Sequence, residues 1–81
     1  MYYFTYVLKS EADGKLYIGW TNNLRKRIME HNSGKVTATK YRKPLKLEYF
    51  EGCLSQGKAI EREKQLKTGF GRAYLKRRLE G

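Results

Sequence analysis

Side chains suited to hydrolysing a phosphodiester bond recur at a few positions of this 81-residue sequence. Such hydrolysis needs an activated water, stabilised charge at the phosphorus and help for the leaving oxygen. The candidates are Tyr6, Tyr17, Arg27 and Glu63, with His31 as a further assistant. Each has a more ordinary role when taken singly, because tyrosines in strands usually pack and arginines beside apolar stripes usually form ion pairs.

The candidates differ in what they could contribute. The planar guanidinium of Arg27 suits a phosphate group. The carboxylate of Glu63 could hold Mg²⁺ together with waters and phosphate oxygens, and the ion would polarise the phosphate and assist the leaving group. A tyrosine can accept the proton of a water only where nearby positive charge lowers its pKa from about 10. The sequence leaves open which of Tyr6 and Tyr17 does so.

The two tyrosines fall on the arms of a predicted β-hairpin. Residues 2–9 and 15–20 are rich in aromatic and β-branched side chains, which is typical of strands. The polar run between them ends in Asp13-Gly14, a strong signal for a hairpin turn. Because residues 2–9 are apolar on both faces, we expect this strand in the middle of a sheet that is covered on both sides.

A first helix is predicted over about residues 23–33, after a capping run of one threonine and two asparagines. Steps of 100° per residue place Leu24, Ile28 and His31 on one stripe of this helix. Arg27 lies beside that stripe. Since Arg27 and His31 are four residues apart, we expect their side chains to be neighbours on the helix surface.

The rest of the chain predicts one strand and two helices. The strand Leu45–Phe50 has one polar face, which favours a sheet edge and gives the strand order 2-1-3. Ser55 is a plausible cap for a second helix that runs to about Lys67. A glycine-containing break over residues 68–71 precedes a last helix over residues 72–80. The expected fold is α+β, a three-stranded antiparallel sheet flanked by helices in the order β-β-α-β-α-α, forming one domain over residues 1–81.

Glu63 stands out because it falls inside the apolar arc of the second helix. With Ala59 at 0°, Leu66 lies at about 340° and Glu63 at about 40°, whereas Glu61 and Lys64 lie on the far side. A carboxylate that faces the core is costly unless it is paired or binds a metal. We therefore favour a functional role for Glu63 over a salt-bridged glutamate on the flank of a helix.

The charge of the chain favours a polyanionic partner. Eighteen Lys and Arg oppose eight Asp and Glu, which gives a net charge of +10, and the cations are dense in residues 35–46 and 72–78. Nucleic acid, most simply DNA, is the expected partner, and a merely solvated basic surface is the alternative. The candidate nucleic-acid ligands are Lys35, Lys40, Arg42, Lys43, Lys46, Arg72, Lys76, Arg77 and Arg78.

Several classes of protein are disfavoured by the sequence. No apolar run approaches the roughly 18 residues of a membrane span, and the N-terminus lacks the basic-then-apolar plan of a signal peptide. Cys53 is the single cysteine, so no internal disulfide is expected, and one cysteine with one histidine makes no zinc cluster. We therefore expect a cytoplasmic protein.

The tyrosine-bearing motifs resemble those of the GIY-YIG nuclease domain. Tyr17-Ile18-Gly19 matches the second half of that signature, and Phe4-Thr5-Tyr6 keeps the tyrosine of the first half. The spacing from these motifs to Arg27 and His31 is similar to that of GIY-YIG homing endonucleases, without gaps. Ile60–Glu63 resembles the segment that holds the family's metal-binding glutamate. The resemblance covers nearly the whole chain and is greatest, in overall plan, to small stand-alone bacterial GIY-YIG proteins.

The resemblance implies a role for each candidate residue. The two tyrosines border the scissile phosphate, and one of them helps to activate water. Gly19 lets the backbone pack closely at the site, and Arg27 stabilises the charge that develops at the phosphorus. Glu63 binds a single divalent ion, Mg²⁺ or Mn²⁺, and His31 supports the site.

Three functions are compatible with these observations. The first is a divalent-metal-dependent endonuclease that selects DNA by structure, such as flaps, branches or single strands, with a protein partner that could supply targeting. The second is a non-catalytic nucleic-acid-binding module of the same fold, because no asparagine follows Glu63, where many members of the family have one. The third is a small basic protein associated with ribonucleoprotein. Only the first predicts cleavage that Glu63→Ala abolishes.

Overall fold

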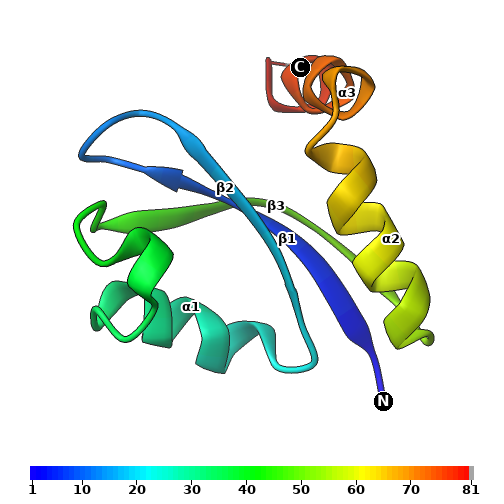
Figure 1. The fold of residues 1–81 in the computed structure, drawn as a ribbon, viewed down its shortest axis with the longest axis horizontal. Helices are drawn as coiled ribbons and strands as arrows, with labels where there is room; N and C mark the ends of the chain where they lie inside the picture. Colours follow the sequence, from blue (N-terminus) through cyan, green and yellow to red (C-terminus); the bar gives the residue numbers. More distant parts are fainter. Residues whose placement is uncertain (81) are drawn as a thin grey trace.

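A three-stranded antiparallel sheet with helices on both faces forms the body of the protein (Figure 1). The computed structural model describes residues 1–80. The strands, in the spatial order β2-β1-β3, are β1 (Tyr3–Ser10), β2 (Leu16–Thr21) and β3 (Leu45–Cys53). The helices are α1 (Leu24–Asn32), the short 3-10 helix η1 (Thr37–Thr39), α2 (Gln56–Leu66) and α3 (Gly69–Glu80). The predicted α+β class, the order of the elements and the order of the strands are confirmed.

The central strand β1 sends alternate side chains into two separate cores. Tyr6 and Leu8 pack on the side of α1, where Ile28 contacts them. Val7 packs on the opposite face, against Leu66 of α2 and the buried face of α3. Because side chains of a strand alternate between faces, the apolar character of both faces placed β1 correctly in the middle of the sheet.

Side-chain caps fix where α1 and α2 begin. The Asn23 side chain accepts a hydrogen bond of 3.1 Å from the backbone N–H of Lys26, and the Ser55 hydroxyl accepts one of 3.3 Å from that of Lys58. These bonds satisfy amides that have no partner within the helix. The predicted starts of both helices therefore agree with the structure to within about a residue.

Strand β3 extends beyond its predicted end at Phe50, as far as Cys53. Its last residues pair with the first residues of β1, with Cys53 opposite Tyr3 and Gly52 opposite Phe4. Gly52 has little strand propensity of its own. The hydrogen-bonded ladder along β1 overrides that preference.

Helix α3 begins at Gly69, so the predicted break over residues 68–71 was wrong beyond its first residue. The hydroxyl of Thr68 accepts a hydrogen bond of 3.2 Å from the backbone N–H of Gly71 and caps the new helix. A Cβ at Gly71 would lie 2.2 Å from the carbonyl oxygen of Gln65. Glycine is therefore needed here for the close crossing of α2 and α3.

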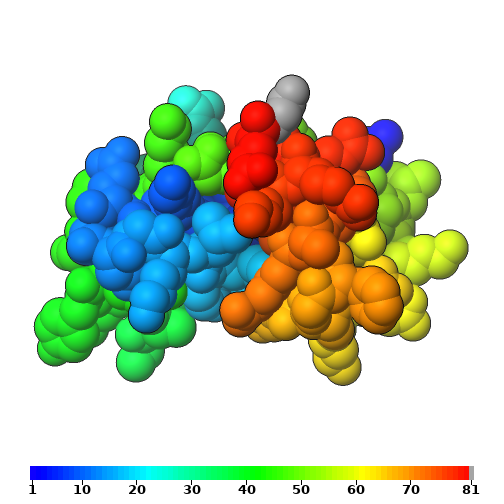
Figure 2. Space-filling model, turned by 90° about the horizontal axis from the view of Figure 1, so that it is seen from above, coloured from blue at the N-terminus to red at the C-terminus, as the bar shows by residue number. Residues whose placement is uncertain are grey.

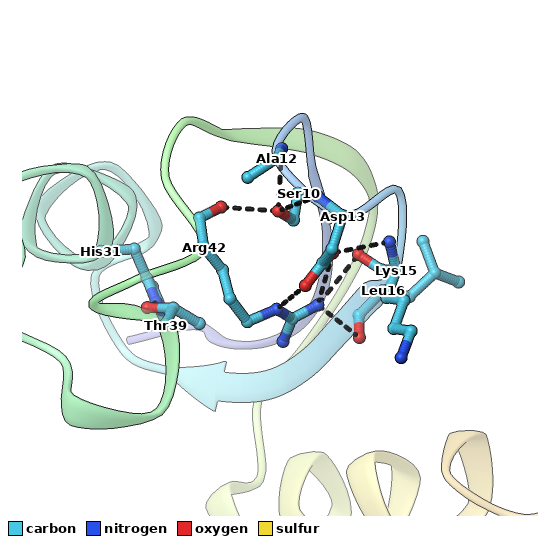
Figure 3. A network of polar contacts seen from close by, with 8 residues as sticks. All are labelled: Ser10, Ala12, Asp13, Lys15, Leu16, His31, Thr39 and Arg42. Atoms are coloured by element: carbon cyan, nitrogen blue, oxygen red, sulfur yellow. Dashed lines mark hydrogen bonds and ion pairs between the residues drawn. The ribbon is translucent and has the colours of Figure 1, made fainter.

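The loop over residues 35–43 contains η1 and ends in a tie to the hairpin turn (Figure 3). Arg42 donates from Nε to Asp13 Oδ2 at 2.8 Å and from Nη2 to the carbonyl oxygen of Lys15 at 3.1 Å. The hydroxyl of Ser10 donates to the carbonyl oxygen of Arg42 at 2.6 Å. The Arg42 guanidinium holds the pKa of the Asp13 carboxyl at about 2, well below its usual range. Within residues 1–80, no helix is long and apolar enough to cross a membrane.

Candidate active site

A chain of hydrogen bonds is buried between β1, α1 and η1. The Tyr6 hydroxyl lies 2.8 Å from Nε2 of His31, and Nδ1 of His31 lies 2.7 Å from the hydroxyl of Thr39. None of the three residues is more than 1% exposed. Burying polar groups is tolerated when they bond to one another. We refer to these three residues as the buried chain.

The position of Arg27 favours one direction for the bonds in the buried chain. Burial raises the pKa of the Tyr6 hydroxyl above its ordinary value, while a hydrogen bond from Arg27 opposes that rise. A guanidinium can only donate, so the Tyr6 oxygen accepts from Arg27 and its own proton points to Nε2 of His31. His31 therefore has its proton on Nδ1 and donates to Thr39.

His31 is uncharged at neutral pH. Burial and, to a smaller extent, the positive charge of Arg27 lower the pKa of its imidazole to about 4, against an opposing effect of Glu30. An uncharged imidazole provides one donor and one acceptor. These match the acceptor at Thr39 and the donor at Tyr6, so the buried chain is fully satisfied at neutral pH.

Gly19 makes room for the ring of Tyr6. The two residues are directly opposite each other in the β1–β2 ladder. A Cβ at Gly19 would lie 2.6 Å from Oη and 2.7 Å from Cζ of Tyr6, far inside van der Waals contact. Any larger residue at position 19 would therefore displace the hydroxyl that bonds to His31.

Tyr17 closes the buried chain on the side of β2. Its ring centroid lies 5.0 Å from that of His31 and 6.5 Å from that of Tyr6. Unlike Tyr6, it is only half-buried. Tyr17 is therefore the more exposed of the two candidate tyrosines.

Arg27 connects the buried chain to the surface. Its side chain is 36% exposed, and its Nη1 lies 3.4 Å from Oε1 of Glu30. It also lines a surface recess of about 250 Å³ formed by the end of β2 and the start of α1, together with Trp20 and Lys26. One guanidinium can thus contact the Tyr6 hydroxyl beneath it and an anion in the recess.

Glu63 approaches from α2, which covers the opposite face of the sheet. Its side chain is 18% exposed, and its Oε2 lies 3.5 Å from Nζ of Lys67. Its charge contributes to raising the pKa of Tyr6, although less than burial does. The structure therefore brings Glu63 within electrostatic reach of Tyr6 but leaves it outside the buried chain.

Glu63 is the residue of this site that could hold a metal ion. Residues 1–80 contain no cluster of three or more histidines, cysteines or carboxylates. Mg²⁺ is commonly held by one or two carboxylates together with waters and substrate phosphates. A single, partly buried carboxylate such as that of Glu63 fits that mode of binding.

The basic residues expected to bind nucleic acid do not gather in one patch. The loop that carries Lys35, Lys40 and Lys43 lies beside α1, whereas Arg72 and the cations after it lie on α3 at the far end of the molecule (Figure 1). Most of these side chains are exposed, including Lys46 on β3. Nucleic acid would therefore meet two separate basic surfaces.

Two of those basic residues have partners within the protein. Arg42 is held by the hairpin turn and is 24% exposed. Arg78 donates from Nε to the Tyr74 hydroxyl at 3.2 Å and its guanidinium lies 5.3 Å from the centroid of that ring. We therefore leave Arg42 and Arg78 out of the surfaces discussed below.

A second polar cluster lies on the α2 and α3 side of the sheet. Arg62 donates to both carboxylate oxygens of Glu51, at 2.9 and 3.0 Å, and stacks on Tyr74. The Tyr49 hydroxyl lies 3.0 Å from that of Tyr74. Burial raises the pKa of Tyr49, and the hydrogen bonds from Tyr49 and Arg78 lower the pKa of Tyr74. These pairs satisfy one another and join β3 to both helices.

Thr39 is the residue of the buried chain that the sequence did not single out. It lies in a basic loop with a second threonine two residues earlier, and η1 is too short to show a periodic pattern. Only the fold brings its hydroxyl to His31. The sequence indicated only that His31 faces inward from its helix, and therefore that a partner for its ring was needed.

Comparisons with known proteins agree with the resemblance seen in the sequence. The family model described as the GIY-YIG catalytic domain matches residues 2–78. A UPF0213 protein of Bacillus pumilus (strain SAFR-032) is 48% identical over 67 residues, which are 82% of this chain and 67% of that protein. A UPF0213 protein of Staphylococcus epidermidis (strain ATCC 12228 / FDA PCI 1200) is 36% identical over 80 residues, 98% of this chain and 96% of that one. The solution NMR structure of a UPF0213 protein from Bacillus halodurans is similar with a TM-score of 0.57 and 29% identity, covering 93% of this chain and 82% of that one.

Proposed function

Because the chain belongs to the GIY-YIG family, among the UPF0213 proteins, we propose that it is an endonuclease that hydrolyses DNA phosphodiester bonds with one divalent metal ion. Membership of the family supports nuclease-type activity. The observation that carries the proposal is the placement of Arg27, which lies close enough to the Tyr6 hydroxyl to oppose the rise of its pKa and also lines an open recess. An arginine held in this way is suited to receive a phosphate.

Arg27 binds the scissile phosphate and stabilises the charge that develops on it. The Tyr6 hydroxyl holds the guanidinium from beneath, and the buried chain in turn holds Tyr6. Preorganised donors of this kind stabilise a transition state without reorganising during the reaction. Tyr6 is buried and keeps its proton at neutral pH, so its task is to orient Arg27.

Tyr17 is the tyrosine that contacts the attacking water in this proposal. It is more exposed than Tyr6, and its ring lies against His31. A tyrosine in contact with both solvent and a buried imidazole can hold a water in place and share its proton.

Glu63 holds the metal ion. When bound, Mg²⁺ or Mn²⁺ supplies a Lewis acid that polarises the phosphate and stabilises the leaving oxygen. Lys67, now paired with Glu63, must give up the carboxylate oxygen that the ion takes. An ion held by Glu63 would therefore compete with Lys67 for the carboxylate and would need phosphate oxygens and waters as further ligands.

DNA structure rather than base sequence is the expected basis of selection. The domain measures 29 × 29 × 20 Å and offers little surface for reading bases in a groove. Shape and deformability then decide which sites are cut. A separate protein could supply targeting.

A nicking assay on supercoiled plasmid and on flap oligonucleotides, with Mg²⁺ or Mn²⁺, tests the proposal. We expect metal-dependent cutting that Glu63→Gln and Arg27→Lys each reduce by about 100-fold or more, since each removes a group specific to the transition state. The matched controls are Glu61→Gln and Arg25→Lys, which change exposed residues of the same two helices. Both controls should cut like the parent protein.

Two results would contradict this assignment. Cutting that survives both site substitutions comes from another residue or another protein. A parent protein that binds DNA in a salt-dependent way but never cuts it is instead a binding module. The ion pair between Glu63 and Lys67 favours that second function, because a metal ion would have to displace Lys67 from the carboxylate.

A further inference from the structure

A groove outside the candidate active site separates the hairpin from α3. It has a volume of about 1000 Å³, and its walls are the turn end of the β1–β2 hairpin and one side of α3. Figure 2 looks onto this side of the molecule, with the hairpin in blue facing α3 in orange to red. We call it the α3 groove.

The walls of the α3 groove are basic. Two cations stand on the hairpin side, Lys9 and Lys15, and two on α3, Arg72 and Lys76, while Lys67 lies between the helices. Two carboxylates oppose these five cations, Glu48 and Glu80. The positive excess on both walls favours an anion that runs along the groove between them.

The floor of the α3 groove is apolar. Ile18 and Leu75 belong to the core beneath it, and Leu16 and Leu79 extend that apolar surface toward solvent. Leu16 is 38% exposed in a protein whose other aliphatic strand residues are largely covered. An apolar floor between cationic walls suits a chain with flat apolar groups and a charged backbone, which describes an unpaired nucleic-acid strand.

The dimensions of the α3 groove favour one strand over a duplex. A duplex is a stiff cylinder of two paired strands, and its major groove alone is about 12 Å wide, whereas an unpaired strand is thinner and flexible. Such a cylinder cannot enter a hollow of about 1000 Å³ between a hairpin and a single helix. A single strand of a few nucleotides can.

Two residues connect the α3 groove to the candidate active site. Tyr17 lines the groove and also packs its ring 5.0 Å from that of His31. Lys67 lines the groove and lies 3.5 Å from the carboxylate of Glu63. A strand lying in the groove would therefore meet the metal-binding edge of the site.

We propose that the α3 groove binds one unpaired DNA strand and leads it toward Glu63. The inference rests on the proposed nuclease for the destination of that strand, but the binding itself does not depend on cutting. If this inference is correct, the substrate of the enzyme is a junction between duplex and single-stranded DNA, such as a flap. The strand's phosphates contact both walls, and its bases lie over the leucines.

Charge reversal on each wall tests the inference without metal, so that binding is measured apart from cleavage. The variants are Lys9→Glu on the hairpin wall and Lys76→Glu on the α3 wall, and the matched control is Lys64→Glu on the exposed side of α2. Fluorescence anisotropy reports binding to a labelled DNA strand of about 12 nucleotides and to a blunt duplex of the same sequence. Circular dichroism checks that all three variants fold.

We expect each groove variant to weaken binding of the single strand about tenfold and to reduce its salt slope by about 0.7, the value of one lost phosphate contact. Lys64→Glu should change the affinity by about twofold or less and leave the slope unchanged. Binding of the blunt duplex should respond alike in all three variants. Equal effects of the control, or competition by a poly-glutamate peptide as strong as that by unlabelled strand, would overturn the inference.

The same variants separate this inference from the proposed function. A parent protein that cuts plasmid while its groove variants bind the strand normally would refute the groove and leave the nuclease intact. Groove variants that lose the strand in a protein that never cuts would refute the nuclease and leave the groove intact.

Discussion

The two faces of the sheet bury different kinds of side chain from neighbouring residues of β1, polar on one face and apolar on the other. On the α1 side, Tyr6 carries a hydroxyl into the interior, where His31 and Thr39 must satisfy it. On the other side, Val7 enters an apolar core with Leu66 of α2. The first face depends on hydrogen bonds of defined direction, whereas the second depends on packing.

This difference separates chemistry from stability within a very small protein. Polar groups in the interior add little net stability even when they are satisfied, but each costs on the order of 1–3 kcal/mol when its partner is lost. Apolar burial on the α2 and α3 face supplies the stability that lets the α1 face hold a buried polar arrangement. Substitutions on the α2 and α3 face should therefore mainly lower stability, whereas substitutions on the α1 face should also change the pH dependence of stability or the proposed activity.

Gly71→Ala should have the largest effect on stability. Its Cβ would lie 2.2 Å from a backbone oxygen and 2.3 Å from Leu66 Cα, and backbone atoms cannot move aside cheaply. We expect the free energy of unfolding to fall by about 4 kcal/mol, beyond the usual cost of overpacking. Urea unfolding monitored by circular dichroism measures it. Gly69→Ala is the control, since a Cβ there meets no atom within 4 Å. A Gly71→Ala protein as stable as this control would show that the two helices cross less closely.

Acid should destabilise the protein through the α1 face. The pKa of His31 is about 4 in the folded protein and about 6.5 when unfolded, so between these values the unfolded chain binds the extra proton. Stability is therefore fully present above pH 6.5 and falls toward pH 4, by about 3 kcal/mol. Urea unfolding between pH 7 and pH 4 measures this slope.

The control for the acid effect is His31→Gln, which removes the only histidine of the chain. This variant should be less stable at pH 7 but should lose most of the slope between about pH 6.5 and about pH 4. The Asp13 carboxyl does not confuse the measurement, because its stabilising effect is lost only below its ordinary value of 3.8. If the unfolding free energy of the parent protein depends on pH no more than that of His31→Gln, the His31 imidazole is not desolvated.

Gly19→Ala should separate stability from activity. Its Cβ meets the end of the Tyr6 side chain, which can move, so we expect a smaller loss of about 2 kcal/mol. The displaced Tyr6 hydroxyl can no longer orient Arg27, so nicking should fall about 100-fold in protein that is still folded. The plasmid assay below the unfolding temperature measures it. Normal nicking by a folded Gly19→Ala protein would show that Tyr6 is not needed.

Thr39→Val should have the smallest effect of the four. It keeps the shape of the side chain and leaves the N–H of His31 Nδ1 without an acceptor, which costs about 1–2 kcal/mol. Thr37→Val, at an exposed position of the same 3-10 helix, is the matched control and should change stability by less than about 0.5 kcal/mol. Thermal unfolding compares the two. Equal stability of the two variants would mean that water or another group takes the place of the Thr39 hydroxyl.

Much of the fold could be predicted because local patterns agreed with the final packing. The two apolar faces of β1 placed it in the centre of the sheet, and Asn23 and Ser55 marked the starts of two helices. The predictions failed where long-range contacts decide. Gly52 belongs to β3 because β1 is its partner, and Gly71 belongs to α3 because α2 crosses there.

The candidate site shows the same division. Helical spacing indicated that Glu63 faces inward and that Arg27 and His31 are neighbours, because these relations are local to one helix. Thr39 could not be found in this way, since its hydroxyl reaches His31 only after the loop folds back. The nucleic-acid role of Arg42 stays a prediction, and a charge count could not show that its guanidinium also pairs with Asp13.

The contact between Gly19 and Tyr6 also limits how this protein can evolve. A mutation that adds a side chain at position 19 could be compensated by a shorter residue at position 6, which would restore the packing of the sheet. Every such suppressor removes the phenol that occupies the space above Gly19. A protein with both changes would fold but would lack the hydroxyl near Arg27. If that hydroxyl is needed for activity, selection constrains positions 6 and 19 together.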